Sequence, residues 1–184
     1  MADEHDVPAG RLTEWLDEFA GALRDERDSV VPCDGCTACC RASHFVHVGP
    51  DETDALAHIP RELLFPAPHR PPGHVLMGYD ERGHCPMLVD DRCTIYEHRP
   101  RACRTYDCRI FAATGVDPAD DGPTKAEVAA RVARWRFDTA DPADRELHDD
   151  LRAAAREGTA TTTASERAVG AVEVVLWRGT RRPA

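Results

Sequence analysis

The sequence predicts a small α+β protein: a loop-rich cysteine-cluster core with a short β meander, flanked by N-terminal and C-terminal helices. Three observations predict this class. Apolar residues recur at helical spacing near both ends of the 184-residue chain. All eight cysteines lie between Cys33 and Cys108, in a stretch rich in turn-forming residues. Short apolar or β-branched runs separated by polar turns occupy residues 74–97.

The N-terminal segment, residues 1–30, is predicted to be an amphipathic helix. Its apolar residues recur at the three- and four-residue steps of a helix: Leu12, Trp15, Leu16, Phe19 and Leu23. Acidic residues stand between them, so we expect a helix over residues 9–26. Trp15 and Phe19 are expected to pack in the core.

The central segment, residues 31–115, is predicted to be the cysteine-cluster domain. Its first part, residues 31–42, has a turn-rich composition that fits a metal-binding knuckle better than a regular element. Residues 44–49 predict a short strand, and residues 50–59 a short helix capped by its acids. The proline-rich stretch 66–74 predicts a loop.

The second part of this segment predicts a small meander followed by a short helix. Residues 74–97 hold three apolar or β-branched runs, separated by "DERG" and "DDR". Pro100 then suits the first position of a short helix within residues 97–108, because its missing N–H needs no partner there.

The C-terminal segment, residues 116–184, is predicted to be a helical extension. The predicted helices cover residues 125–137, 143–157 and 166–179. Pro123 or Thr124 opens the first, Asp141 and Pro142 cap the second, and Gly158 ends it. Residues 159–165 form a spacer by composition, and the run "VEVVLW" within the last helix leaves a strand as an alternative.

Charge and hydropathy narrow the kinds of partner. The formal net charge is −10, and the chain has no long basic run. Nucleic acids and anionic membranes both require a cationic surface, so neither is expected as a partner. The N-terminus lacks the basic and apolar regions of a secretory signal, and no stretch approaches the roughly 20 apolar residues of a membrane span. We therefore expect a cytoplasmic protein whose partner is a metal ion, a small molecule or another protein.

The spacing of the cysteines indicates metal ligation. The first group reads Cys-x2-Cys-x2-Cys-Cys, and the second is spread over a longer stretch: Cys33, Cys36, Cys39 and Cys40, then Cys85, Cys93, Cys103 and Cys108. A Cys-x2-Cys pair wraps a tight turn so that both thiolates reach one ion. The cytosol keeps thiols reduced, so metal ligation is favoured over disulfides. Two groups of four predict eight ligands, for zinc or for iron, including an iron–sulfur cluster.

The adjacent pair Cys39 and Cys40 raises the question of one metal centre or two. In an extended chain successive side chains point to opposite faces, so the two sulfurs could not easily reach one ion. Either one of them lies behind the ligand shell, or each serves a different centre. A vicinal disulfide is the less favoured third alternative.

Other polar residues near the cysteines suggest a supporting role. Arg99 and Arg104 are candidate cofactor-binding residues, because arginines can donate hydrogen bonds to metal-bound sulfurs or hold a carboxylate substrate; the alternative is a solvated surface. Tyr96 and Tyr106 are expected in the core. Four nearby histidines are alternative ligands, but each is expected to have a structural role or to lie at the surface: His44, His47, His84 and His98.

The motifs "CDGCTACCR" and "GHCPMLVDDRCTIYEHRPRACRTYDCRIF" together resemble the YkgJ-type cysteine-cluster family of zinc- or iron-chelating domains, over about residues 31–115. The resemblance implies a metal role for seven cysteines: Cys33, Cys36, Cys39, Cys40, Cys85, Cys93 and Cys103. Tyr96, Arg99, Pro100 and Arg104 fall on the family's other recurrent positions. Cys108 completes the eight ligand candidates by spacing alone.

These observations leave three hypotheses for function. The leading one is a cytosolic metal-binding protein that chelates zinc or an iron–sulfur cluster. The second is a metal- or iron–sulfur-dependent enzyme, in which Arg99, Arg104 and Tyr106 would position a small-molecule or protein substrate. The third is a metal-stabilised module that binds a protein partner. A closed four-thiolate site would favour the first or third, and a site with three protein ligands and a water would favour the enzyme.

Overall fold

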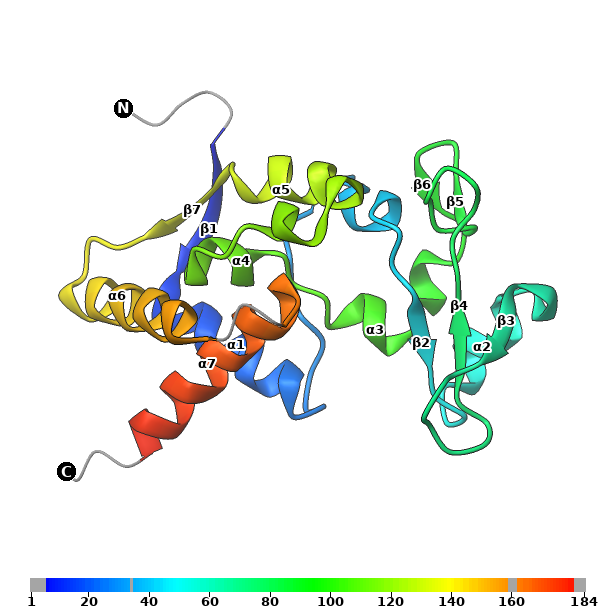
Figure 1. Ribbon diagram of the computed structural model, residues 1–184, viewed down its shortest axis with the longest axis horizontal. Helices are drawn as coiled ribbons and strands as arrows, with labels where there is room; N and C mark the ends of the chain where they lie inside the picture. Colours follow the sequence, from blue (N-terminus) through cyan, green and yellow to red (C-terminus); the bar gives the residue numbers. More distant parts are fainter. Residues whose placement is uncertain (1–5, 34, 159–161, 181–184) are drawn as a thin grey trace.

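Two separate apolar cores organise the chain, one among helices and one beneath a small sheet (Figure 1). The computed structural model describes residues 6–33, 35–158 and 162–180. We call the first core the helical core. The second, the sheet core, packs under a three-stranded sheet. The predicted α+β class with flanking helices is confirmed, whereas the division at residues 30/31 and 115/116 stays a prediction.

The predicted N-terminal helix is confirmed as α1, Leu12–Leu23, with Trp15 and Phe19 buried as expected. A strand that the sequence did not predict precedes it. This strand, β1 (Val7–Arg11), pairs in parallel with β7 (Trp135–Asp138). The register shifts between Pro8 and Gly10, where Gly10 has a φ of +88°, a conformation that glycine adopts without strain.

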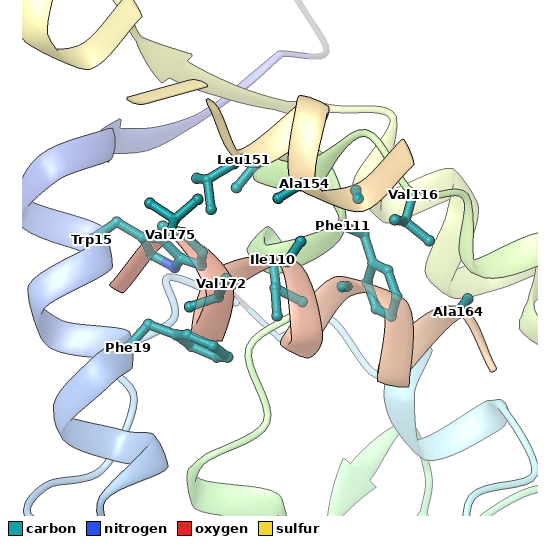
Figure 2. Close-up of a cluster of buried hydrophobic side chains, with 14 of the residues drawn as sticks. Trp15, Phe19, Ile110, Phe111, Val116, Leu151, Ala154, Ala164, Val172 and Val175 are labelled. Carbon is teal, nitrogen blue, oxygen red and sulfur yellow. The ribbon is translucent and has the colours of Figure 1, made fainter. Parts of the chain in front are cut away.

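The helical core gathers one face from each of several helices (Figure 2). Trp15 and Phe19 of α1 stack with ring centroids 5.2 Å apart and lie against Val172 and Val175 of the last helix. The other helices are α4 (Arg109–Thr114), α5 (Ala126–Val132), α6 (Pro142–Glu157) and α7 (Ala164–Thr180). Alanines on α6 and α7 let these two helices approach closely.

The C-terminal predictions are confirmed in part. The predicted helix over 125–137 is wrong in its second half, because it ends at Val132 and the chain turns into β7. Asp141 caps α6 as predicted, accepting a hydrogen bond from the Ala143 N–H at 2.8 Å. The run "VEVVLW" is helical within α7. The predicted spacer over residues 159–165 lies partly outside the described residues. Before α5, the chain forms two short 3-10 turns, Pro118–Asp121 and Pro123–Lys125.

A buried polar network fixes the start of α4 against α1. The Asp107 carboxylate accepts hydrogen bonds from the Trp15 indole N–H at 3.0 Å and from the Arg109 guanidinium at 2.7 Å. Asp107 and Arg109 are only 4% and 5% exposed. Arg109 also donates to the carbonyl oxygens of Ala9 and Val30, so one side chain joins β1, the segment before the cysteines and α4.

The sheet core differs from the predicted meander. Its sheet has the order β2–β4–β3, all antiparallel: Val46–Val48, Val75–Met77 and Leu64–Pro66. The first predicted run, which contains β4, therefore does not pair with the second, and the predicted loop over 66–74 begins inside β3. Helix α2 (Thr53–His58) and a 3-10 turn at Arg61–Leu63 connect β2 to β3.

The rest of the predicted meander is a separate two-stranded hairpin, β5 (Leu88–Val89) and β6 (Arg92–Cys93). Its turn residues Asp90 and Asp91 both have positive φ, of 47° and 58°, as the tight turn of a two-residue hairpin loop requires. A 3-10 turn at Tyr96–His98 and the short helix α3 (Arg101–Arg104) follow. Pro100 stands just before α3, at its N-cap, one position earlier than predicted. Among the described residues, none of the helices combines the length and the hydropathy needed to cross a bilayer.

Candidate metal centre

All eight cysteines line a single cavity of about 820 Å³. The cavity lies where the two cores meet. On one wall Cys36 and Cys108 pack against the helical core; on the other, Cys85, Cys93 and Cys103 pack against the sheet core. All eight are free thiols, and Cys33 is the most exposed of them.

The first cysteine group is shaped by two consecutive turns. The Cys36 N–H donates to the Cys33 carbonyl oxygen at 2.9 Å, and Gly35 takes a φ of +74° that favours glycine. A 3-10 helix over Ala38–Arg41 then carries the adjacent pair. Successive side chains of a 3-10 helix are about 120° apart instead of opposite, so Cys39 and Cys40 both reach the cavity. The chain is therefore not extended at this pair, and the assignment of the two thiols to one centre or to two stays a prediction.

The second group is brought to the first by main-chain contacts. The Cys85 N–H donates to the Cys40 carbonyl oxygen at 2.7 Å, which joins the two cysteine segments directly. Cys93 comes from the β5–β6 hairpin, Cys103 from α3, and Cys108 from the N-cap of α4. The Trp135 indole N–H lies 3.2 Å from the Cys108 sulfur and donates to it.

The electrostatic neighbours of the thiols divide them into two trios that share Cys39. One trio is Cys33, Cys36 and Cys108, and the other is Cys85, Cys93 and Cys103. Burial and then the charges of neighbouring cysteines raise the pKa of Cys33 to about 11 and that of Cys103 to about 12. A hydrogen bond with Cys40, followed by burial, raises the pKa of Cys39 well above its usual range.

The cavity is also lined by hydrogen-bond donors that lack an acceptor. Among the described residues, three buried side-chain nitrogens have no hydrogen-bond partner: His44 Nε2, Arg104 Nε and Arg131 Nε. All three residues line the cysteine cavity. A buried N–H without a partner is destabilising by about 1–3 kcal/mol, so an acceptor bound next to this wall would stabilise the protein.

His44 is a neutral donor at this wall. Burial, reinforced by the charge of Lys125, lowers its pKa to about 4. Lys125 Nζ lies 3.5 Å from His44 Nδ1 and can only donate a hydrogen bond, so Nδ1 is the acceptor and Nε2 carries the proton. His44 is therefore partly buried beside the cavity, and its structural role stays a prediction.

The two predicted arginines both line the cavity but are held differently. The Arg99 guanidinium lies 3.6 Å from the centroid of the Tyr96 ring, and its Nε donates to the Tyr96 carbonyl oxygen at 2.7 Å. Arg104 pairs with Asp28 at 3.5 Å through Nη1, leaving Nε unpaired. The predicted core position of Tyr96 is wrong, because the ring is 55% exposed beneath Arg99. Tyr106 does lie against the cavity, and burial raises its pKa.

The other rival histidines have partners elsewhere. His47 Nε2, on β2, lies 3.0 Å from Nδ1 of His74, the residue before β4. The backbone N–H of His84 donates to the Asp80 carboxylate. His98 contacts Asp54. His44 alone of the four named histidines is therefore part of the cavity wall.

Arg131 is the main wall residue that the sequence did not indicate. It lies on α5, where its guanidinium covers the Trp135 ring at 4.4 Å and its Nη2 donates to the Pro32 carbonyl oxygen at 3.1 Å. Its charge also acts on Cys33. No local motif marks it, since it stands 23 residues after the last cysteine in an ordinary helical pattern.

The thiol sulfurs are spread over the cavity wall. Among the described residues, the trio of potential ligand atoms that all lie within 4.8 Å of one another is formed by Asp54, His58 and His98, outside the cavity. No three thiol sulfurs meet that limit. In a tetrahedral zinc site with Zn–S bonds near 2.3 Å, the sulfurs lie about 3.8 Å apart. The thiol spacing is therefore wider than a mononuclear zinc site requires.

Comparison with known proteins gives one match. The curated proteins and the solved structures contain no significant match to this chain. Residues 32–121 match a family model described as "CxxCxxCC: Putative zinc- or iron-chelating domain". The match spans all eight cysteines and overlaps the resemblance that the sequence motifs indicated. The cysteine-bearing part of this chain is thus similar to the zinc- or iron-chelating domains of the CxxCxxCC type.

Proposed function

We propose that this chain is a cytosolic iron–sulfur protein that binds its cluster in the cysteine cavity between the two cores. The observation that carries the proposal is that all eight thiols, from segments spread between Cys33 and Cys108, line one cavity. Free structural cysteines would be scattered through the cores, and eight thiols kept reduced require a reducing compartment. The family description, zinc- or iron-chelating, admits either metal.

The spacing of the thiols favours a cluster over a single ion. A mononuclear site draws four sulfurs together around one metal, whereas the four cysteines of a [4Fe–4S] cluster each bind a different iron and so lie further apart. No three thiol sulfurs of the described chain lie within 4.8 Å of one another. A cavity of about 820 Å³ also exceeds the volume that one ion requires.

The unpaired donors of the wall suit an anionic occupant. Thiolate-ligated centres carry excess negative charge and are stabilised by hydrogen bonds to their sulfurs. His44, Arg104 and Arg131 offer three buried N–H groups for this purpose. Arg99 adds a positive charge near Cys103, and Trp135 already donates to the Cys108 sulfur. When bound, an iron–sulfur cluster supplies one-electron transfer or redox sensing.

The grouping of the cysteines suggests which of them supply ligands together. Each trio lies on the wall of its own core, and Cys39 neighbours both. We infer that each trio supplies three ligands and that Cys39 and Cys40 complete the set. Cys39→Ser is then expected to disturb both groups, whereas Cys33→Ser, at the exposed rim, disturbs one.

The decisive experiment is anaerobic purification of the full chain with visible spectroscopy and analysis of iron, zinc and acid-labile sulfide. We expect a coloured protein with iron and sulfide in similar amounts. Cys39→Ser should lose more iron than Cys33→Ser. A colourless protein with stoichiometric zinc contradicts the cluster, and a metal-free protein with eight titratable thiols contradicts metal binding altogether.

The donor wall can be tested by the reduction potential of the cluster. Arg131→Met removes a positive charge and an N–H donor beside Cys33, so the reduced, more negative state is stabilised less and the potential falls. Arg136→Met is the matched control, because Arg136 is exposed on β7 and pairs with Asp6. Equal potentials in the two variants would show that Arg131 does not act on the cluster.

A further inference from the structure

We propose that Asp54, His58 and His98 form a second metal site, open to solvent, that binds a divalent transition-metal ion. One potential ligand atom from each residue lies within 4.8 Å of the other two. None of the three lines the cysteine cavity. The donor set, two imidazoles and a carboxylate, also differs from the thiolates of the cavity, so the two sites offer a metal ion different ligand chemistry.

Two elements far apart in sequence build the site. Asp54 and His58 are four residues apart on α2 and therefore lie on the same helix face. His98 ends the 3-10 turn Tyr96–His98, which packs against α2. The His98 Nδ1 lies 2.9 Å from one carboxylate oxygen of Asp54, and the His58 Nδ1 lies 3.6 Å from the other. A single ion beside the carboxylate can thus be reached by both rings.

The two rings are held in position before any ion binds. Their centroids are 3.5 Å apart and their planes differ by 3°. The His58 Nδ1 also lies 2.8 Å from the Asp54 carbonyl oxygen, a contact that a bound ion would replace. Because a metal lies in the plane of each ligating ring, at least one of the parallel rings must turn towards the other before both can bind one ion. Both side chains are about 40% exposed, which leaves room for that rotation.

The chemistry of the donors defines the class of ion. Neutral imidazoles with a carboxylate suit zinc, nickel, copper and iron(II), whereas magnesium and calcium prefer oxygen ligands alone. Three protein ligands leave further positions to water, so bound metal would exchange with solvent. Arg104 interacts electrostatically with Asp54 and opposes a bound cation, so we expect weaker binding here than in the thiolate cavity.

Cobalt(II) distinguishes the two sites. Thiolate-bound cobalt gives intense sulfur-to-metal charge-transfer absorption, whereas cobalt bound by nitrogen and oxygen gives only weak bands. We expect titration of the full chain, after removal of its iron and under reducing, anaerobic conditions, to fill the cavity first. One further equivalent should then bind without added charge-transfer absorption, as measured by equilibrium dialysis.

Variants decide whether that further equivalent belongs to this site. His58→Ala and His98→Ala should each weaken it by about tenfold or more, with the charge-transfer signal unchanged. The matched control is His69→Ala, which removes an exposed histidine from the loop after β3. The proposal is overturned if no cobalt binds beyond the charge-transfer phase, or if all three variants bind the further equivalent equally. Loss of the charge-transfer phase alone would count against the cysteine centre and leave this site standing.

Discussion

The helical core and the sheet core are stabilised by different means. Among the described residues, eighteen buried apolar side chains form the helical core, and only seven form the sheet core. Three cysteines pack against the smaller core, on the wall of a large cavity. Burial of apolar surface alone suffices for the first, whereas small cores generally need a further cross-link such as a bound metal. The comparison teaches that metal and folding should be coupled in one half of the molecule only.

Removing the metal should have the largest effect on stability, and that effect should be confined to the sheet half of the molecule. Structural metal sites contribute on the order of 10 kcal/mol to folding. After chelation under reducing conditions, we expect amide protection to fall over residues 31–105 and to persist in α1, α6 and α7. Hydrogen exchange followed by mass spectrometry measures both regions in one sample. Equal loss of protection in both halves would show that the cores are not independent.

Breaking the buried pair between Asp107 and Arg109 should have the next largest effect. Arg109→Leu leaves the Asp107 carboxylate buried without its guanidinium partner, with the Trp15 indole N–H and the backbone N–H of residue 109 as its remaining donors, which should reduce the free energy of unfolding by about 3–5 kcal/mol. Denaturant unfolding measures the loss.

The matched control for this change is Arg178→Leu. Arg178 pairs with Glu157 at 3.1 Å on an exposed surface, where a salt bridge contributes about 0–1 kcal/mol. Similar losses in the two variants would show that burial does not strengthen the inner pair.

Equivalent valine truncations in the two cores sharpen the comparison. Val172 of α7 and Val48 of β2 are both completely buried. Each change to alanine should reduce the free energy of unfolding by about 1–3 kcal/mol in the metal-loaded protein. In the metal-free protein, Val172→Ala should keep its effect and Val48→Ala should lose it. A persistent effect of Val48→Ala after chelation would mean that the sheet core forms without metal.

The smallest effect concerns a carboxylate that joins α6 to α1. Burial would raise the pKa of Asp144, but hydrogen bonds from the Thr13 N–H and from Arg11 more than offset this, so the pKa lies below its usual value. The stabilisation is therefore complete above the unfolded-state pKa of about 3.9 and is lost as the pH falls through the folded-state value.

Replacing this carboxylate tests the direction of the pKa shift. Asp144→Asn should reduce the free energy of unfolding by about 1 kcal/mol at neutral pH and have little effect in strong acid. Thermal unfolding of both proteins across acidic pH gives the difference. A difference that grows as the pH falls would contradict the direction of the shift.

The sequence alone determined the features that depend on neighbouring residues. The apolar spacing of Leu12, Trp15 and Phe19 specifies a helix wherever it stands, and Asp141 with Pro142 starts one. The spacing of the eight clustered cysteines, which is that of a known family, indicates a metal-chelating domain from the sequence alone.

Only the tertiary structure decided which distant residues share a site. The pairing of β1 with β7 joins residues more than a hundred positions apart, so no local pattern reports it, and it ends the predicted helix at Val132. His44 and Arg131 line one cavity because the 3-10 helix Ala38–Arg41 and α5 pack together. Cys39 and Cys40 face one cavity because the chain coils into a 3-10 turn there. Local preference sets the type of each element, but side chains converge only through the packing of whole elements, which periodicity within a short window does not contain.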